Sequence, residues 1–109
     1  MESEKQLDLV FYALADQRRR LMLEQLADGP KPVSALADAV GLKMSAASKH
    51  VAAIEAAGLI MKVRQGREMV CHMNFDRWRM VASYIAMHAK FWASRLNELE
   101  NHLREMGAK

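Results

Sequence analysis

The chain has 109 residues, of which 51% are hydrophobic and 27% charged, and its formal net charge at pH 7 is +3. This length suits one domain, residues 1–109, with enough apolar content for a core. The sequence contains no apolar run near the roughly 20 residues that cross a bilayer and no signal-peptide pattern at its start. It has a single cysteine, which excludes an intramolecular disulfide. We therefore expect a cytoplasmic protein without a membrane partner.

The first part of the chain predicts two helices. Apolar residues recur at three- and four-residue spacing over residues 1–15, which is typical of an amphipathic helix. Asp16 is a suitable N-cap for a second helix that reaches Ala27, and Gly29 followed by Pro30 ends it.

Residues 34–57 predict a helix-turn-helix. Ser34 can cap a short helix that ends near Val40, and Gly41 supplies the backbone freedom for a tight turn. Ser45 can cap the next helix. Two helices joined by a glycine-containing turn are a common device for placing the second helix in the major groove of DNA.

Residues 59–74 predict a hairpin. Apolar and polar residues alternate over 59–64 and again over 68–74, with a turn at Gln65 and Gly66. A hairpin with a basic tip after a helix-turn-helix indicates a winged helix-turn-helix. The expected fold class is mainly α with a small β-hairpin.

The candidate DNA contacts are basic and small polar residues of this segment. Lysine and arginine neutralise phosphates and fix the register, whereas hydroxyl groups and small side chains allow approach to base edges. One arginine of residues 18–20 is also expected to reach DNA, and for His50 a hydrogen bond within the domain is an equally good interpretation. The predicted DNA-binding residues are Lys43, Ser45, Ala46, Ser48, Lys49, His50, Arg64, Gln65, Arg67 and Arg19.

The C-terminal part of the chain predicts one long helix. Its pattern runs from about residue 75 to residue 106, about 32 residues or roughly 48 Å at 1.5 Å per residue. A near-heptad apolar stripe on so long a helix needs cover from a partner, which predicts a two-fold homodimer built from residues 1–15 and 75–106. The predicted dimerisation residues are Leu7, Val10, Phe11, Trp78, Ile85, Trp92, Leu96, Leu99 and Leu103.

Three segments resemble the ArsR/SmtB family of winged-helix repressors. Residues 13–19, Ala-Leu-Ala-Asp-Gln-Arg-Arg, are similar to the family's opening Ala-Leu-Ala-Asp-Pro-Thr-Arg, with Arg19 at the position of its arginine. Residues 45–60, with Ser-Lys-His-Val and Ala-Gly-Leu-Ile, resemble its recognition helix and the start of its wing, and residues 66–67 resemble its wing tip. The resemblance implies a homodimer that binds double-stranded DNA at a palindromic operator and blocks transcription.

The metal-sensing motifs of this family are incomplete here. Residues 32–36 contain no cysteine, and His102 and Glu105 would need further ligands at Ala89 and Phe91, whose side chains cannot bind a metal. Residues 90–100 instead resemble a branch without a recognised inducer site. We expect no metal and no other cofactor, and the sequence identifies no small-molecule effector.

Two alternatives stay open. One is a repressor that responds to a small molecule or to oxidation near Trp78, Trp92 and Cys71, although a buried structural Cys71 is the favoured interpretation of its place in a strand. The other is a helical protein-interaction module that does not bind DNA. An enzyme is not expected, because the sequence shows no catalytic triad, phosphate-binding loop or paired carboxylates.

Overall fold

The computed structural model describes residues 2–107. The chain divides into two compact units, Met1–Trp78 and Arg79–Lys109. The elements in chain order are α1 (Glu2–Leu14), α2 (Gln17–Gln25), a 3-10 turn η1 (Leu26–Asp28), β1 (Lys31–Pro32), α3 (Val33–Val40), α4 (Met44–Ala56), β2 (Ile60–Gln65), β3 (Glu68–Met73) and α5 (Phe75–Glu105). The expected fold class, mainly α with a β-hairpin, is confirmed.

One of the three predicted N-cap residues is correct and two are wrong. Asp16 caps α2 as predicted, and its Oδ1 accepts hydrogen bonds from the backbone N–H groups of Arg18 (2.8 Å) and Arg19 (3.1 Å). Ser34 and Ser45 were predicted as caps, and both predictions are wrong, because each serine lies inside the first turn of its helix.

The N-cap positions of α3 and α4 belong instead to Pro32 and Lys43, which have extended backbones with ψ of 155° and make no side-chain cap hydrogen bond. The φ of Pro32 is −70°, close to the value that its ring imposes. Because Pro32 stands before the first helical residue, its missing N–H removes no hydrogen bond of α3.

The turn between α3 and α4 forms where the sequence predicted it. Gly41 has a φ of 67°, a left-handed conformation that glycine adopts without a steric penalty. The N–H groups of Gly41 and Leu42 donate to the carbonyl oxygens of Asp38 (3.2 Å) and Ala37 (2.9 Å), respectively. These bonds close α3 and redirect the chain into α4.

The sheet has three antiparallel strands in the order β1-β3-β2, one more than the sequence predicted. The added strand is β1, in which Lys31 pairs with Cys71 and Pro32 with Val70. Two residues are too few to show an alternating pattern, and the proline indicated a loop, so the sequence contained no signal for this strand.

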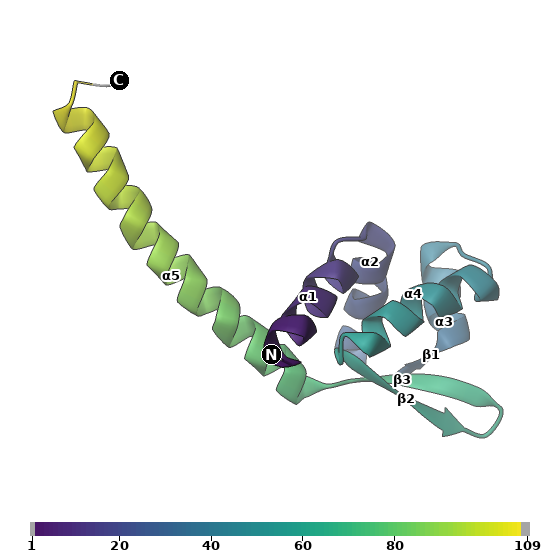
Figure 1. Ribbon diagram of the computed structural model, residues 1–109. Helices are drawn as coiled ribbons and strands as arrows, with labels where there is room; N and C mark the ends of the chain where they lie inside the picture. The colour runs from purple at the N-terminus through teal and green to yellow at the C-terminus, as the bar shows by residue number, and fades with distance from the viewer. Residues whose placement is uncertain (1, 108–109) are drawn as a thin grey trace. The chain divides into compact units, whose positions relative to one another are not determined.

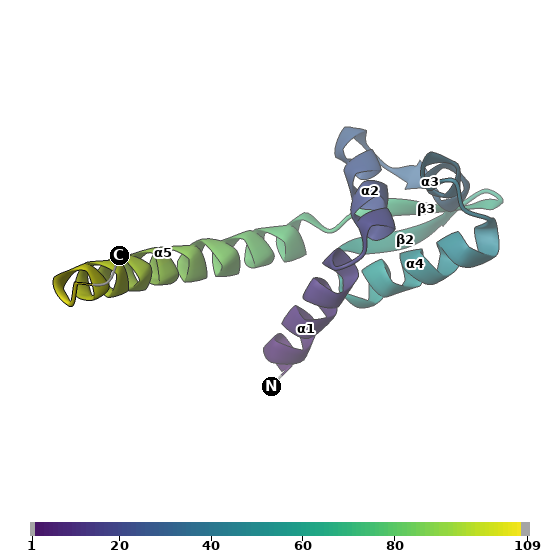
Figure 2. The same cartoon turned by 90° about the horizontal axis from the view of Figure 1, so that it is seen from above.

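The first unit packs its helices around this sheet. Met22, Leu36, Ile54 and Leu59 are among its fully buried side chains, and they come from α2, α3, α4 and the residue before β2. In Figures 1 and 2, the turn between β2 and β3 lies at the same end of the unit as the start of α4. The packing therefore brings together two segments that are about 20 residues apart in sequence.

Cys71 is fully buried in β3, as the sequence predicted. Burial raises the pKa of its thiol above the ordinary value, because a thiolate would lose its hydration there. A buried thiol with a raised pKa has little of the reactive thiolate, which disfavours a redox role.

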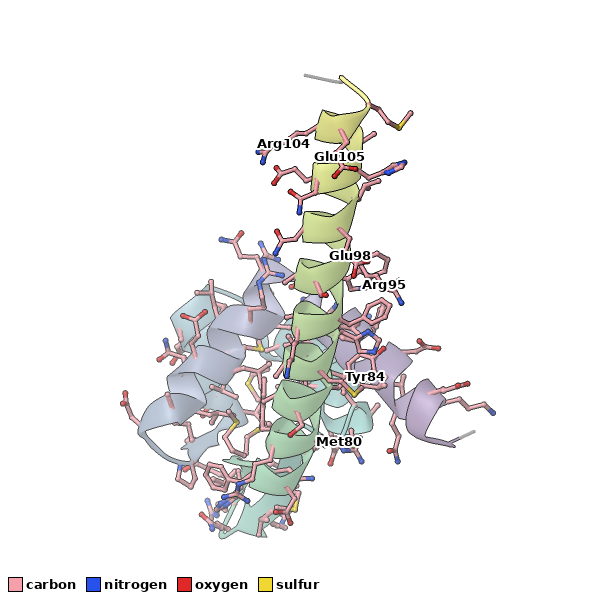
Figure 3. All side chains as sticks on the ribbon, turned by 90° about the vertical axis from the view of Figure 1, so that its left-hand side faces the viewer. Met80, Tyr84, Arg95, Glu98, Arg104 and Glu105 are labelled. Carbon is pink, nitrogen blue, oxygen red and sulfur yellow. The ribbon has the colours of Figure 1, made fainter. Side chains whose placement is uncertain are left out.

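Helix α5 contains 31 residues, close to the predicted length. Within Arg79–Lys109, Figure 3 shows Arg95 and Arg104 on different sides of the helix, and each pairs with a glutamate of the same helix, Glu98 (3.9 Å) and Glu100 (3.5 Å). Although α5 is long, no helix within residues 2–107 combines the length and the apolar content needed to cross a membrane.

Candidate nucleic-acid interface

Helix α4 has one buried face and one exposed face. Ala47, Val51 and Ile54 are buried and hold the helix against the first unit, as their helical spacing predicted for the last two. The candidate contacts on the opposite side are accessible: Lys43, Ser45, Ser48 and Lys49 are exposed, and Ala46 and His50 are partly exposed.

The tip of the hairpin, residues 64–67, is the second exposed basic segment. Arg64, Gln65 and Arg67 are all exposed. The two residues between the strands are Gly66 and Arg67, so the turn lies one residue later than predicted. The shift places Arg67 in the turn itself.

A groove of about 370 Å³ lies between the hairpin, the start of α3 and the first half of α4. Its wall combines hydroxyl groups, two cations, the carboxylate of Glu68 and thioether side chains. Residues that line it include Ser34, Met44, Ser48, Lys62, Arg67 and Met69. The groove joins the exposed face of α4 to the hairpin tip in one continuous surface.

The cations around this surface differ in what they already bind. Lys62 forms an ion pair with Glu55, with Nζ 3.4 Å from Oε1. Lys49, Arg64 and Arg67 form no ion pair with any residue that the structure describes. A phosphate backbone can therefore recruit their charge without breaking an existing pair.

Arg19 was predicted to reach DNA, and the structure corrects this. Arg19 is only 8% exposed. Its Nε donates to the carbonyl oxygen of Ala13 (2.8 Å), and its Nη2 donates to that of Tyr12 (2.7 Å). Since the last carbonyls of a helix have no partner within it, Arg19 satisfies the end of α1. Its role is structural.

The other two arginines of the triplet differ from Arg19 and from each other. Arg20 donates from Nη1 to the carbonyl oxygen of Leu14 (2.6 Å), so it also holds the end of α1. Arg18 is exposed, its backbone N–H donates to Asp16, and its side chain forms no hydrogen bond or ion pair with any residue among 2–107.

Residues 16–62 match the model of the bacterial regulatory proteins of the arsR family. The crystal structure of an ArsR family transcriptional regulator, RHA00566, is 33% identical, with a TM-score of 0.73 over 81% of this chain and 97% of that one. The chain belongs to the ArsR family. This family consists of transcriptional regulators rather than enzymes.

Two further relatives extend the comparison of this ArsR-family chain. The homodimeric winged helix-turn-helix DNA-binding domain Mb0332 of Mycobacterium bovis is 28% identical, with a TM-score of 0.67 over 84% of this chain and 85% of that domain. The HTH-type transcriptional regulator NmtR of Mycobacterium tuberculosis is 36% identical over 69 residues, 63% of this chain. The matched segments span 58% of NmtR and 24% of a second curated regulator from that organism.

The residues predicted for dimerisation are not all available on the surface. Val10 is fully buried, so it belongs to the core and its assignment as a partner contact is wrong. Trp78 is partly buried, and its indole N–H donates to the carbonyl oxygen of Leu59 (3.2 Å). The other candidates stay accessible: Leu7 is partly exposed, and Phe11, Ile85, Trp92, Leu96, Leu99 and Leu103 are exposed.

Sequence reasoning missed the polar contacts that fix the chain after α4. Asn74 donates from its amide to the carbonyl oxygen of Gly58 (2.9 Å), and Arg77 donates from Nη1 to that of Ala57 (2.8 Å). An asparagine and an arginine in these positions look like ordinary surface residues in a sequence, since only the fold brings the end of α4 next to them. Within residues 2–107, no group of three or more His, Cys, Asp or Glu side chains is arranged to hold a metal ion.

Proposed function

We propose that this protein is a homodimeric transcriptional repressor that binds an inverted-repeat operator in double-stranded DNA. The observation that supports it most is the surface formed by the first half of α4 and the hairpin, around which Lys49, Arg64 and Arg67 are exposed and form no ion pair with any described residue. Family membership supports the same function, and a neighbour in structure is a homodimeric DNA-binding domain.

In this proposal α4 is the recognition helix and the β2–β3 hairpin is the wing. Ser45 and Ser48 read base edges or adjacent phosphates in the major groove, where small side chains allow close approach. Lys49 and the two wing arginines neutralise phosphates and fix the register.

The dimer gives the operator its symmetry. A two-fold axis between the subunits presents two recognition helices about 34 Å apart, one turn of B-DNA, so the operator is palindromic. Occupation of a promoter then blocks transcription, and such a protein works in the cytoplasm. We propose that the accessible apolar residues of α1 and α5 form the dimer interface.

The test is selection of DNA from a random duplex pool, followed by fluorescence anisotropy with the selected duplex and a scrambled control near physiological salt. We expect an inverted repeat that is preferred by at least about 10³-fold, the range of specific DNA-binding proteins. Enrichment of no sequence, with only weak and salt-sensitive binding, would contradict the proposal and favour a protein-interaction module instead.

A further inference from the structure

We propose that Arg19 holds His50 in the neutral tautomer that carries its proton on Nε2, so that α4 offers an imidazole N–H donor to a DNA phosphate. Arg19 is then a positioning residue, and His50 is the contact. The first part concerns the free protein alone, and the second part rests on the proposed DNA-binding function.

The guanidinium of Arg19 has a fixed direction. Two of its nitrogens donate to the carbonyl oxygens of Ala13 and Tyr12, and Cζ lies 4.8 Å from the centre of the Tyr12 ring. These three contacts all come from α1. They leave Nη1 as the nitrogen that faces α4, where it lies 3.4 Å from Nδ1 of His50.

The chemistry of arginine decides which ring nitrogen of His50 carries the proton. A guanidinium stays charged and has donors but no acceptor, so Nδ1 of His50 must accept in this contact. In a neutral imidazole only one nitrogen carries hydrogen, and that hydrogen is therefore on Nε2.

Among residues 2–107, Asp16 is the one carboxylate within ion-pair distance of Nδ1. Its Oδ1 lies 3.9 Å from Nδ1, beyond hydrogen-bond distance, and already accepts two backbone N–H groups at the start of α2. Arg19 therefore determines the tautomer of the neutral ring.

The remaining ring nitrogen of His50 is accessible. The side chain of His50 keeps 21% of its surface exposed, and its Nε2 is not buried. Nε2 forms no hydrogen bond with any group that the structure describes. His50 follows Lys49 on α4, so the two side chains point about 100° apart around the helix. A neutral N–H at this place can donate to a phosphate oxygen beside the one that Lys49 neutralises.

The tautomer is tested in the free protein by long-range ¹H–¹⁵N correlation spectra of the histidine rings at about pH 8, where an ordinary imidazole is neutral. We expect His50 to show a protonated Nε2 and an unprotonated Nδ1. In the Arg19→Lys variant, which keeps the charge but cannot reach three partners, we expect a mixture of tautomers. A protonated Nδ1 in the wild-type protein overturns the proposal even if the variant does not fold.

The DNA contact is tested with a matched pair of variants. His50→Asn places an amide oxygen near the level of Nδ1, where it can accept from Arg19, but has no group at the level of Nε2. His50→Gln places an amide nitrogen near Nε2 and loses the acceptor. We expect the asparagine variant to bind the selected operator about tenfold more weakly and the glutamine variant to stay within about twofold of wild type.

The salt dependence separates this contact from that of a lysine. A neutral donor releases no counterion, so neither variant should change the slope of log K against log salt. Equal affinities of the two variants, or a reduced slope for the asparagine variant, overturn the phosphate contact. If the wild-type protein binds no duplex, the proposed function fails together with this contact, whereas the ring spectra still decide the tautomer.

Discussion

The lysines and arginines of the first unit differ in whether they already have a partner within the protein. Lys62 is paired with Glu55, and Arg19 and Arg20 donate to the last carbonyl groups of α1. Lys49 and the arginines of the hairpin tip have no such pair among the described residues. Sequence spacing predicted which side of α4 is exposed, but it could not separate Arg19 from its neighbours, because a buried acceptor is a property of the fold.

Replacement of Lys49 by alanine tests the proposed phosphate contact. We expect weaker operator binding. We also expect the negative slope of log K against log salt to become shallower by about one unit, because one phosphate contact is lost. Fluorescence anisotropy across a salt series measures both quantities. Lys31→Ala on β1 makes the same change of charge outside both the predicted DNA-binding residues and the predicted dimerisation segments, and should leave the slope unchanged; equal slopes for all three proteins would count against Lys49.

Cys71 gives a stability prediction with a definite sign. Burial raises the pKa of its thiol, so above the ordinary pKa of about 8.5 the unfolded chain releases a proton that the folded protein retains. The free energy of unfolding should therefore fall as the pH rises through this range. Urea unfolding between about pH 7 and about pH 9.5 measures the fall, and Cys71→Ala should reduce it; a variant with the same pH dependence would refute the assignment.

Among the helices and strands, the order of the helices and the hairpin was predictable from the sequence, whereas the residues at which α3 and α4 begin were predicted wrongly. Ser34 and Ser45 are good caps by residue type, yet the backbone turns two residues earlier at Pro32 and Lys43. β1 was missed, because its pairing with β3 depends on a contact made far along the chain. The first turn of a helix and a two-residue strand are both set by the surrounding packing.

Two glycines with left-handed backbones test how the fold closes after α4 and at the hairpin tip. Gly58 and Gly66 have φ of 76° and 64°, so alanine at either position should cost about 1 kcal/mol or more in backbone strain. A Cβ at Gly58 would also lie 2.7 Å from Cζ of Arg77, which holds the carbonyl oxygen of Ala57, whereas a Cβ at Gly66 would meet nothing within 4 Å.

We therefore expect Gly58→Ala to lower the free energy of unfolding more than Gly66→Ala does. Urea unfolding followed by circular dichroism compares the two variants with the wild-type protein. A larger loss for Gly66→Ala would show that the Arg77 contact contributes little.

At the scale of the whole molecule, the long helix was the most predictable element. Periodicity over about 30 residues is a strong signal, and α5 ends within one residue of its predicted end. The pairing of its exposed side chains with a second subunit remains a prediction. Trp92, Leu96, Leu99 and Leu103 repeat at spacings of four and three, as the apolar positions of a helix pair do, and each is 43% exposed or more.

Charge in this stripe should separate the subunits. We expect Leu99→Asp to shift the protein to a monomer in sedimentation velocity, because a dimer would bury an unpaired carboxylate at the interface. Asn101→Asp adds the same charge on the opposite side of α5, about 180° around the helix from Trp92, and should remain a dimer. Dimers in both variants would place the interface elsewhere.

The Glu55–Lys62 ion pair has a consequence for the kinetics of binding. It joins the last turn of α4 to β2 of the hairpin, and only three residues separate that helix from β2. The helix and the hairpin are thus held at a fixed spacing within one packed unit. In the proposed complex, the contacts of one hold the other next to its own phosphates, so complete release needs both to detach together and we expect a long residence time on DNA.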